Sequence, residues 1–220
     1  SLTENPVLEL KNSDAIGSSG SINYGEYGNS PFVVFKTYGI YADVIKANNS
    51  TVSGKTEAYL LSERGENAVA DAYGIYAKQI DAKKGSEIFG GRQSSETEAI
   101  QEPIESSKQF SNSNGIYVGE LNVSKSTVNG FGEQADFSAG IELGKTLNAK
   151  KSVIRGTGAE NSYNSYGIFT SDAHLVLDKE SSFYGKGGDQ SLISGGILLG
   201  NASLVEVKNG SIVGVGGDNV

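Results

Sequence analysis

Apolar and polar residues alternate along most of this chain in short runs, and glycine, asparagine or serine interrupts each run. The stretch from Thr37 reads TYGIYADVIKANNSTVSG, and the stretch from Ala72 reads AYGIYAKQIDAKKGSEIFGG. Alternation with a period of two is typical of β-strands with one buried face, and glycine every few residues disfavours long helices. The pattern therefore predicts an all-β protein made of short strands.

The alternating runs are copies of one repeat. A Gly-Ile pair occurs at positions 39, 74, 115, 140, 167 and 196, and a closing glycine follows each pair after 15 to 18 residues. An incomplete seventh copy begins at Leu8. The closing glycine is 10 or 11 residues from the next pair in three units, but 20 and 25 residues from it in the first two. The period is thus about 25 residues, with insertions near residues 55–71 and 91–113.

Short strands in repeats of this length predict a right-handed parallel β-helix of about seven coils, formed as a single domain over residues 1–220. Leucine-rich repeats have a similar period, but their Leu-x-x-Leu-x-Leu signature is absent. A single coil cannot bury its own apolar face, so stacked coils must share a core. We expect about three short strands per coil, and we expect the two insertions to lie side by side at one corner of adjacent coils.

The repeat also assigns a face to each position, because side chains alternate along a strand. The isoleucine of each pair and the residue two places on should point inward, the residue between them should point outward, and the glycines should turn the chain. The expected inward columns are Ile40, Ile75, Ile116, Ile141, Ile168 and Ile197; Ala42, Ala77, Val118, Leu143, Thr170 and Leu199; and Val52, Ile88, Val128, Ile154, Phe183 and Ile212. The expected outward column is Tyr41, Tyr76, Tyr117, Glu142, Phe169 and Leu198.

Composition narrows the classes of partner. The net charge is −8, and the 18 basic residues form no cluster longer than Lys-Lys, which argues against nucleic acid and anionic lipid. The absence of cysteine excludes a thiol nucleophile, a disulfide framework and a cysteine zinc site. No apolar run approaches the ~20 residues that span a bilayer, and no leader peptide begins at Ser1. We therefore expect a mature chain or a segment of a longer one.

Gly-Ile-Tyr phrases that alternate with phrases such as LNVSKSTVNG, without any cysteine, resemble the passenger domains of bacterial autotransporters. These are the pertactin-like and AIDA-like surface proteins of Gram-negative bacteria, and the resemblance extends over nearly the whole chain. It implies a passenger fragment that is secreted or displayed on the outer membrane by a barrel domain not recognisable in this chain. It also implies an adhesin or virulence factor that binds a host-cell protein or glycan, or that mediates self-association as a stalk.

Two regions are candidates for binding a partner. The first is the pair of insertions, because irregular loops on a rigid scaffold often carry function, and we expect the acidic second insertion to form a partly helical protrusion. The alternative is that both are solvated insertions without a role. The candidate residues in the insertions are Tyr59, Arg64, Glu96, Glu98, Glu102 and Glu105.

The second candidate is the column Tyr41, Tyr76 and Tyr117, which would present an aromatic strip to a sugar or a protein. The alternative is that these rings stabilise their own stack, since aromatic neighbours in a sheet stabilise one another.

Few residues suit catalysis. The only histidine, His174, lies near Asp172 and Ser171, but adjacency in one strand does not supply the geometry of a triad. A β-helical polysaccharide lyase or hydrolase would need charged groups clustered across coils, and scattered solvated charges are the alternative. The candidates for such a cluster are Asp43, Lys46, Lys78 and Asp81. Neither metal-ligand spacing nor a phosphate-binding glycine loop is present, so we expect no enzymatic activity and no cofactor or metal.

Overall fold

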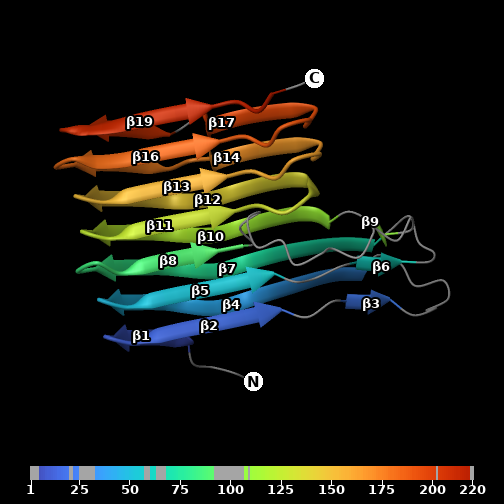
Figure 1. Ribbon diagram of the computed structural model, residues 1–220, viewed down its shortest axis with the longest axis horizontal. Helices are drawn as coiled ribbons and strands as arrows, with labels where there is room; N and C mark the ends of the chain where they lie inside the picture. The colour runs from blue at the N-terminus through green and yellow to red at the C-terminus, as the bar shows by residue number, and fades with distance from the viewer. Residues whose placement is uncertain are drawn as a thin grey trace.

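The structure is a computed structural model that describes residues 5–19, 22–24, 33–56, 60–62, 68–91, 107–108, 110–201 and 203–218. Every regular element in these residues is a β-strand, and the strands form three sheets. Strands of the two large sheets stack in chain order from the N-terminus to the C-terminus (Figure 1). The prediction of an all-β repeat protein is therefore confirmed.

Each coil contributes strands to two large parallel sheets. The nine-stranded sheet contains β1 (Val7–Lys11), β4 (Val33–Asn48), β7 (Ala68–Lys83), β10 (Phe110–Ser124), β12 (Ala135–Lys150), β14 (Asn164–Thr170), β15 (His174–Asp178), β17 (Ile193–Leu199) and β18 (Leu204–Val207). The seven-stranded sheet contains β2 (Asp14–Ser19), β5 (Thr51–Thr56), β8 (Glu87–Gly90), β11 (Thr127–Phe131), β13 (Val153–Thr157), β16 (Ser181–Lys186) and β19 (Gly210–Val215).

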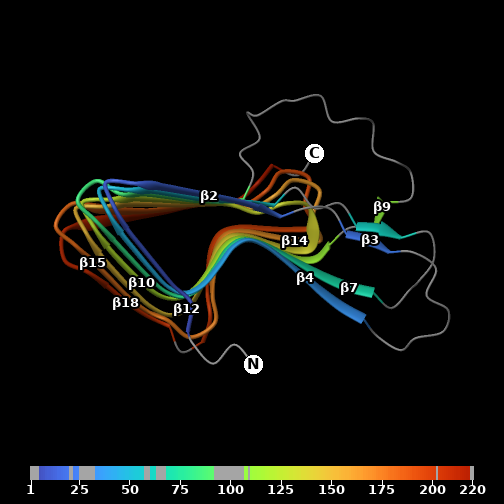
Figure 2. The ribbon, with the colours of Figure 1, turned by 90° about the horizontal axis from the view of Figure 1, so that it is seen from below.

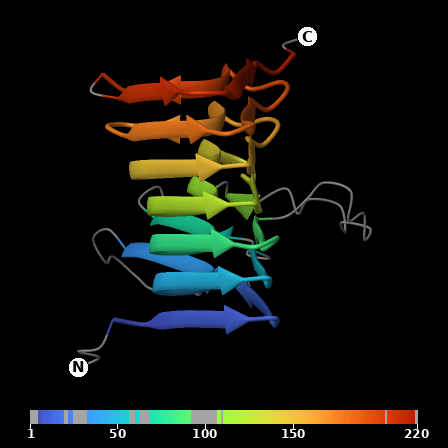
Figure 3. The same ribbon diagram turned by 90° about the vertical axis from the view of Figure 1, so that its left-hand side faces the viewer.

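These sheets are two sides of a parallel β-helix with seven coils, as predicted. The seven-stranded sheet has one strand from each coil, and its order is β19-β16-β13-β11-β8-β5-β2. Figure 3 shows these strands one above another. Figure 2 views the molecule from below, where the chain runs clockwise from β2 through β4 as it recedes from the viewer. The helix is therefore right-handed.

The other two sides of each coil both belong to the nine-stranded sheet. In the earlier coils one long strand forms both sides, and in the later coils two separate strands form them. One residue, Gly119, lies between the two sides in β10, whereas Gly144 and Lys145 lie between them in β12. Residues 171–173 separate β14 from β15, which pair with the two halves of β12. The corner widens from coil to coil until the hydrogen-bond ladder breaks, so the predicted three strands per coil are distinct only toward the C-terminus.

The predicted inward columns lie in the core, which also contains apolar residues outside those columns, such as Ile45, Ile80 and Leu121. The isoleucines at 75, 116, 141 and 168 are fully buried and pair in register across neighbouring strands. Leu199 and Ile212 are exceptions, with exposed fractions of 41% and 39%. They belong to β17 and β19, which among the described strands have a stacked neighbour on one side only.

The repeated glycines lie inside strands where the two large sheets approach each other, so they do not close hairpin-like turns, although the long strands bend at the Gly-Ile pairs. A Cβ atom on Gly54 would lie 2.1 Å from the carbonyl oxygen of Gly74, and one on Gly74 would lie 2.0 Å from the nitrogen of Gly91. The closing glycines of the other coils make the same contact except Gly214 in the last coil, whose Cβ would have its nearest neighbour at 3.3 Å, and only Gly85 and Gly91 among the described glycines have a positive φ. Glycine is required here because a side chain has no space.

The turn before the seven-stranded sheet is made by other residues, which the sequence pattern did not reveal. Asn49, Lys125 and Lys151 have φ angles of 52°, 52° and 51°, and each immediately precedes a buried serine. The Ser152 hydroxyl accepts a hydrogen bond from the Ser126 N–H at 3.4 Å and donates to the Lys150 carbonyl at 2.8 Å. The serines of this internal ladder are Ser50, Ser86, Ser126, Ser152 and Ser181. The ladder satisfies backbone groups that the corner would otherwise bury unpaired.

We predict that Gly130→Ala destabilises the protein strongly, because its Cβ would lie 2.1 Å from the carbonyl oxygen of Gly140. Overpacking of this kind costs about 1–3 kcal/mol or more of unfolding free energy, which urea titration followed by circular dichroism would measure. Gly144→Ala is the matched control, because its nearest neighbour would be 3.4 Å away, an ordinary contact distance. Equal losses for the two variants would contradict the steric explanation.

We also predict opposite effects for two buried hydroxyls. Ser152→Ala leaves the Ser126 N–H without its partner and should cost about 1–3 kcal/mol. The Thr170 hydroxyl is buried in an apolar column and has no hydrogen-bond partner among the described residues, so Thr170→Val should raise the unfolding free energy by about 1 kcal/mol. Urea unfolding of both variants is the measurement, and a loss of stability in Thr170→Val would show that its hydroxyl is satisfied.

Candidate functional site

Five tyrosine rings form a patch on the outer face of the nine-stranded sheet. The tyrosine patch consists of Tyr38 and Tyr41 on β4, Tyr73 and Tyr76 on β7, and Tyr117 on β10. Tyr41, Tyr76 and Tyr117 occupy one register position on three adjacent strands. Their ring centroids are 5.5 Å and 4.7 Å apart, with interplanar angles of 14° and 8°. The predicted outward column therefore exists, and its rings are stacked.

Tyr38 and Tyr73 were not predicted to join this column. The Tyr38 and Tyr41 ring centroids are 5.2 Å apart, although residues three places apart in a straight strand point to opposite faces. The strand must therefore turn between them, at Gly39 and Ile40, and Figure 2 shows that the long strands are bent. The sequence signal that could have revealed this is the first tyrosine of each Tyr-Gly-Ile-Tyr phrase.

The stacked rings do not form a flat platform. Near-parallel rings at these spacings cover much of one another's faces, so the interior of the stack presents mainly ring edges and hydroxyl groups. Tyr73 is only 8% exposed, whereas Tyr41, at the N-terminal end of the stack, is 51% exposed. The contacts support the alternative that the rings stabilise their own stack, and they leave edges, hydroxyls and stack ends for a partner.

Carboxylates and amides border the tyrosine patch. The Asp71 carboxylate is buried, accepts a hydrogen bond from Asn112 Nδ2 at 2.7 Å, and lies 3.8 Å from Lys36 Nζ. Glu142 follows Tyr117 in the outward column and accepts a hydrogen bond from Asn114 Nδ2 at 2.8 Å. Asn114 is only 3% exposed, and its Oδ1 has no hydrogen-bond partner among the described residues.

This environment favours the neutral forms of the acidic groups. Burial raises the pKa of the Tyr73 phenol far above its ordinary value of 10.0, and the nearby Asp71 and Glu142 carboxylates raise it further. Burial also raises the pKa of Glu142, which the hydrogen bond from Asn114 opposes and the charge of Asp71 reinforces. Ionisation of Glu142 therefore carries a desolvation cost.

A second aromatic group lies beyond Glu142 on the same face. The Phe137 and Phe169 ring centroids are 5.1 Å apart in an edge-to-face arrangement, and Tyr166 lies 5.7 Å and 5.9 Å from them. Phe169 on β14 pairs with Glu142 on β12, so it is the next member of the outward column. The column is thus aromatic on both sides of one acidic position.

The described strands of the two insertions lie side by side, as predicted, whereas the expected partly helical protrusion falls on residues outside the described ones. The strand β6 (Leu60–Ser62) pairs with β3 (Ile22–Tyr24) and β9 (Ser107–Lys108), and Figure 2 shows these strands beside the coils. The strands β5, β7 and β10 extend into the predicted insertion boundaries, through Thr56 and from Ala68 and Phe110. The candidates Tyr59, Arg64, Glu96, Glu98, Glu102 and Glu105 lie outside the described residues.

The charged residues proposed as a catalytic cluster pair separately. Lys78 Nζ lies 2.9 Å from Asp43 Oδ2, and Lys46 Nζ lies 3.9 Å from Glu9 Oε2. Asp81 instead accepts hydrogen bonds from Gln79 and Asn122 at 2.9 Å and 2.8 Å. The four groups therefore do not converge on one point.

His174 also has a partner other than the predicted neighbours. Its Nε2 lies 2.9 Å from Glu206 Oε1 on the next coil. Within the described part of the chain, no group of three or more histidine, cysteine, aspartate or glutamate residues is placed to hold a metal ion. A shallow depression of about 310 Å³ lies elsewhere, beside Asn122 and Asn148 on β10 and β12.

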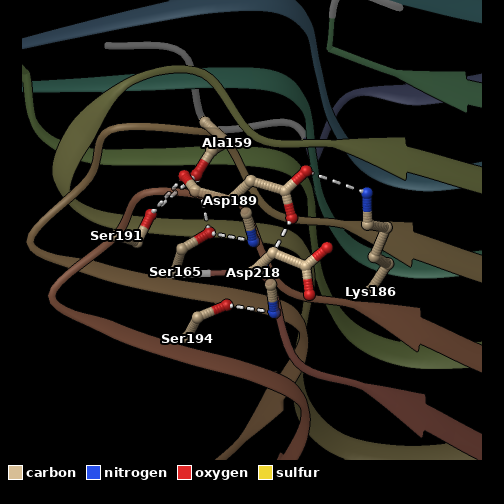
Figure 4. Close-up of polar contacts among 9 residues, drawn as sticks. Ala159, Ser165, Lys186, Asp189, Ser191, Ser194 and Asp218 are labelled. Atoms are coloured by element: carbon tan, nitrogen blue, oxygen red, sulfur yellow. Dashed lines mark hydrogen bonds and ion pairs between the residues drawn. The ribbon is translucent and has the colours of Figure 1, made fainter. Parts of the chain in front are cut away.

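A further polar cluster closes the corner after β16 (Figure 4). Asp189 accepts a hydrogen bond from the Asp218 N–H at 3.0 Å and another from Lys186 Nζ at 3.3 Å, and these bonds lower the pKa of its carboxyl. The Ser165 and Ser194 hydroxyls accept hydrogen bonds from the backbone N–H groups of Gly188 and Gly217 at 2.9 Å and 2.7 Å. These contacts join successive coils, so the cluster is explained by the fold.

We predict that the tyrosine patch makes stability pH-dependent in alkali. The phenol of Tyr73 ionises near pH 10 in the unfolded chain but at higher pH in the folded protein. Its contribution to the unfolding free energy is complete below pH 10 and is lost as the pH rises toward the folded pKa. Urea unfolding at about pH 8 and about pH 11 should therefore show a smaller decline in Tyr73→Phe than in the wild type. Tyr163→Phe, an exposed tyrosine outside the patch, is the control; an unchanged decline in Tyr73→Phe would contradict the assignment.

The chain matches no protein-family model, no curated protein and no solved structure. In the described residues, no helix has the length and apolar character to cross a membrane.

Proposed function

We propose that this chain is a β-helical adhesin segment of the kind found in autotransporter passengers, secreted or displayed at a bacterial cell surface. It binds a host-cell protein or glycan through the outer face of the nine-stranded sheet. The observation that carries the proposal is the tyrosine patch, whose rings lie outside a core that is already complete without them.

Physical properties of the patch support a binding role. Tyrosine combines an apolar ring with a polar hydroxyl, which is why it is enriched at protein interfaces. The middle ring, Tyr76, is held between Tyr41 and Tyr117 on the two adjacent strands. Side chains that are already ordered lose little conformational entropy when a partner binds. A stack that stabilises the fold is therefore also a pre-organised surface.

Catalysis is the less favoured alternative. A polysaccharide lyase or hydrolase needs acidic or basic groups that converge on one substrate bond. The described candidates instead form separate pairs, Asp43 with Lys78 and His174 with Glu206. A stalk that mediates self-association would use the same outer face, and the experiment below separates it from adhesion.

We predict that replacing Tyr76 and Tyr117 together by serine weakens binding of the purified chain to host cells or to glycan-array ligands by about tenfold or more. The Tyr163→Ser variant, which removes an exposed tyrosine outside the patch, should bind like the wild type. Circular dichroism confirms that the variants remain folded. Unchanged binding of a folded double variant would contradict the proposal, and sedimentation showing self-association without cell binding would favour the stalk.

Deletion of residues 57–67 and 92–106 is the companion experiment for the insertions. These deletions leave β5, β7, β8 and β10 intact. Loss of binding in this variant but not in the tyrosine variant would assign adhesion to the insertions in place of the outer face.

A further inference from the structure

The aromatic column on the outer face is interrupted at one position by an acidic residue. Tyr117, Glu142 and Phe169 occupy successive places on β10, β12 and β14. Adjacent strands are about 4.8 Å apart, so the backbones of Tyr117 and Phe169 are about 9.6 Å apart across the Glu142 position. Glu142 is thus bordered by Tyr117 on one neighbouring strand and, on the other, by Phe169, whose ring packs edge-to-face against Phe137 at 5.1 Å.

The groups around this position are carboxylate and amide groups together with the hydroxyls of Tyr73 and Tyr117. The amide nitrogens of Asn112 and Asn114 already donate to Asp71 and Glu142. The buried Oδ1 of Asn114, directly beside Glu142, has no donor among the described residues. Because the Asn114 Oδ1 is buried from solvent, the acceptor open to a ligand is the Glu142 carboxylate, of which Asn114 occupies only Oε2, and a ligand with N–H donors would pair with it.

The charges around Glu142 also favour a ligand with positively charged donors. Among the described residues, Glu142 has no ion-pair partner, Asp71 has only the long contact with Lys36, and Lys78 is paired with Asp43. A glutamine at position 142 would accept the same hydrogen bond from Asn114 without the cost of a partly buried charge. The fold alone therefore does not explain a carboxylate at this position.

We propose that Tyr117, Glu142 and Phe169 receive the guanidinium group of an arginine side chain from a partner protein. A guanidinium is planar, carries five N–H donors, stacks on aromatic rings and pairs with carboxylates in a forked geometry. An ammonium group has the charge but lacks the planar shape, so arginine is preferred to lysine. This inference rests on the proposed binding role of the outer face, and it selects a protein with an exposed arginine over a glycan.

Binding should weaken as the pH falls, because the carboxylate form of Glu142 is required. The titratable groups that face Glu142 are Asp71 and Tyr73 on β7 and Tyr117 on β10, and β14 contributes the uncharged Phe169. Burial holds the pKa of Glu142 above its ordinary value of 4.5. Loss of binding should therefore begin at a higher pH than for an exposed glutamate.

The test titrates the intact chain with N-acetyl-arginine methylamide and follows the ring signals of Tyr117 and Phe169 by NMR spectroscopy. We expect saturable shifts near neutral pH, and affinity weaker by about tenfold or more for the citrulline analogue, which has the same shape without the charge. Glu142→Gln should weaken arginine binding by a similar factor without lowering the urea midpoint of unfolding. Glu160→Gln, at an exposed glutamate elsewhere, is the matched control.

Absence of saturation with arginine, or equal binding by Glu142→Gln and the wild type, would overturn the inference. Shifts of the same signals by methyl glucoside but not by arginine would replace it with a glycan site. The cell-binding assay is independent of this titration. Cell binding that depends on Tyr76 and Tyr117, without arginine binding, would contradict the arginine site and leave the adhesin proposal standing. Arginine binding without cell binding would support the arginine site and contradict the adhesin proposal.

Discussion

The close approach of two sheets at facing glycines is the constraint on which the other features of this structure depend. A Cβ atom on Gly54, Gly130 or Gly156 would lie 2.0–2.1 Å from a carbonyl oxygen of the opposite sheet. No side chain fits there, and the long strands bend at this contact. The bend turns Tyr38 toward the same face as Tyr41, and so determines which side chains form the outer surface.

Beyond this contact, the interior combines apolar columns with internal serine ladders. Isoleucine, leucine and valine from successive coils bury one another, which no single coil can achieve. Serines such as Ser126 and Ser152 occupy the corners, where backbone groups leave the sheet ladders and need other partners. A low apolar content is therefore sufficient for a continuous core, because the corners are closed by hydrogen bonds.

The outer face combines stability with the proposed recognition of a partner. Stacked rings at Tyr76 and Tyr117 gain from one another's contact, and the same contact keeps them ordered for binding. Glu142 is different, because burial disfavours its charge and its hydrogen bond with Asn114 does not require that charge. Residues that cost stability without a structural reason are where function is best sought.

The sequence by itself determined the repeat, the number of coils, three inward columns and the outward column, because alternation along a strand is a local property that each copy repeats. Only the tertiary structure revealed the reason that glycine recurs, which is a close contact between strands of different coils. It also decided that Tyr38 and Tyr73 join the patch, because this depends on where the strand bends. The pairing of Lys46 with Glu9 in place of Asp81 was likewise undetermined by the sequence, because register sets which residues are adjacent but not which side chains reach one another.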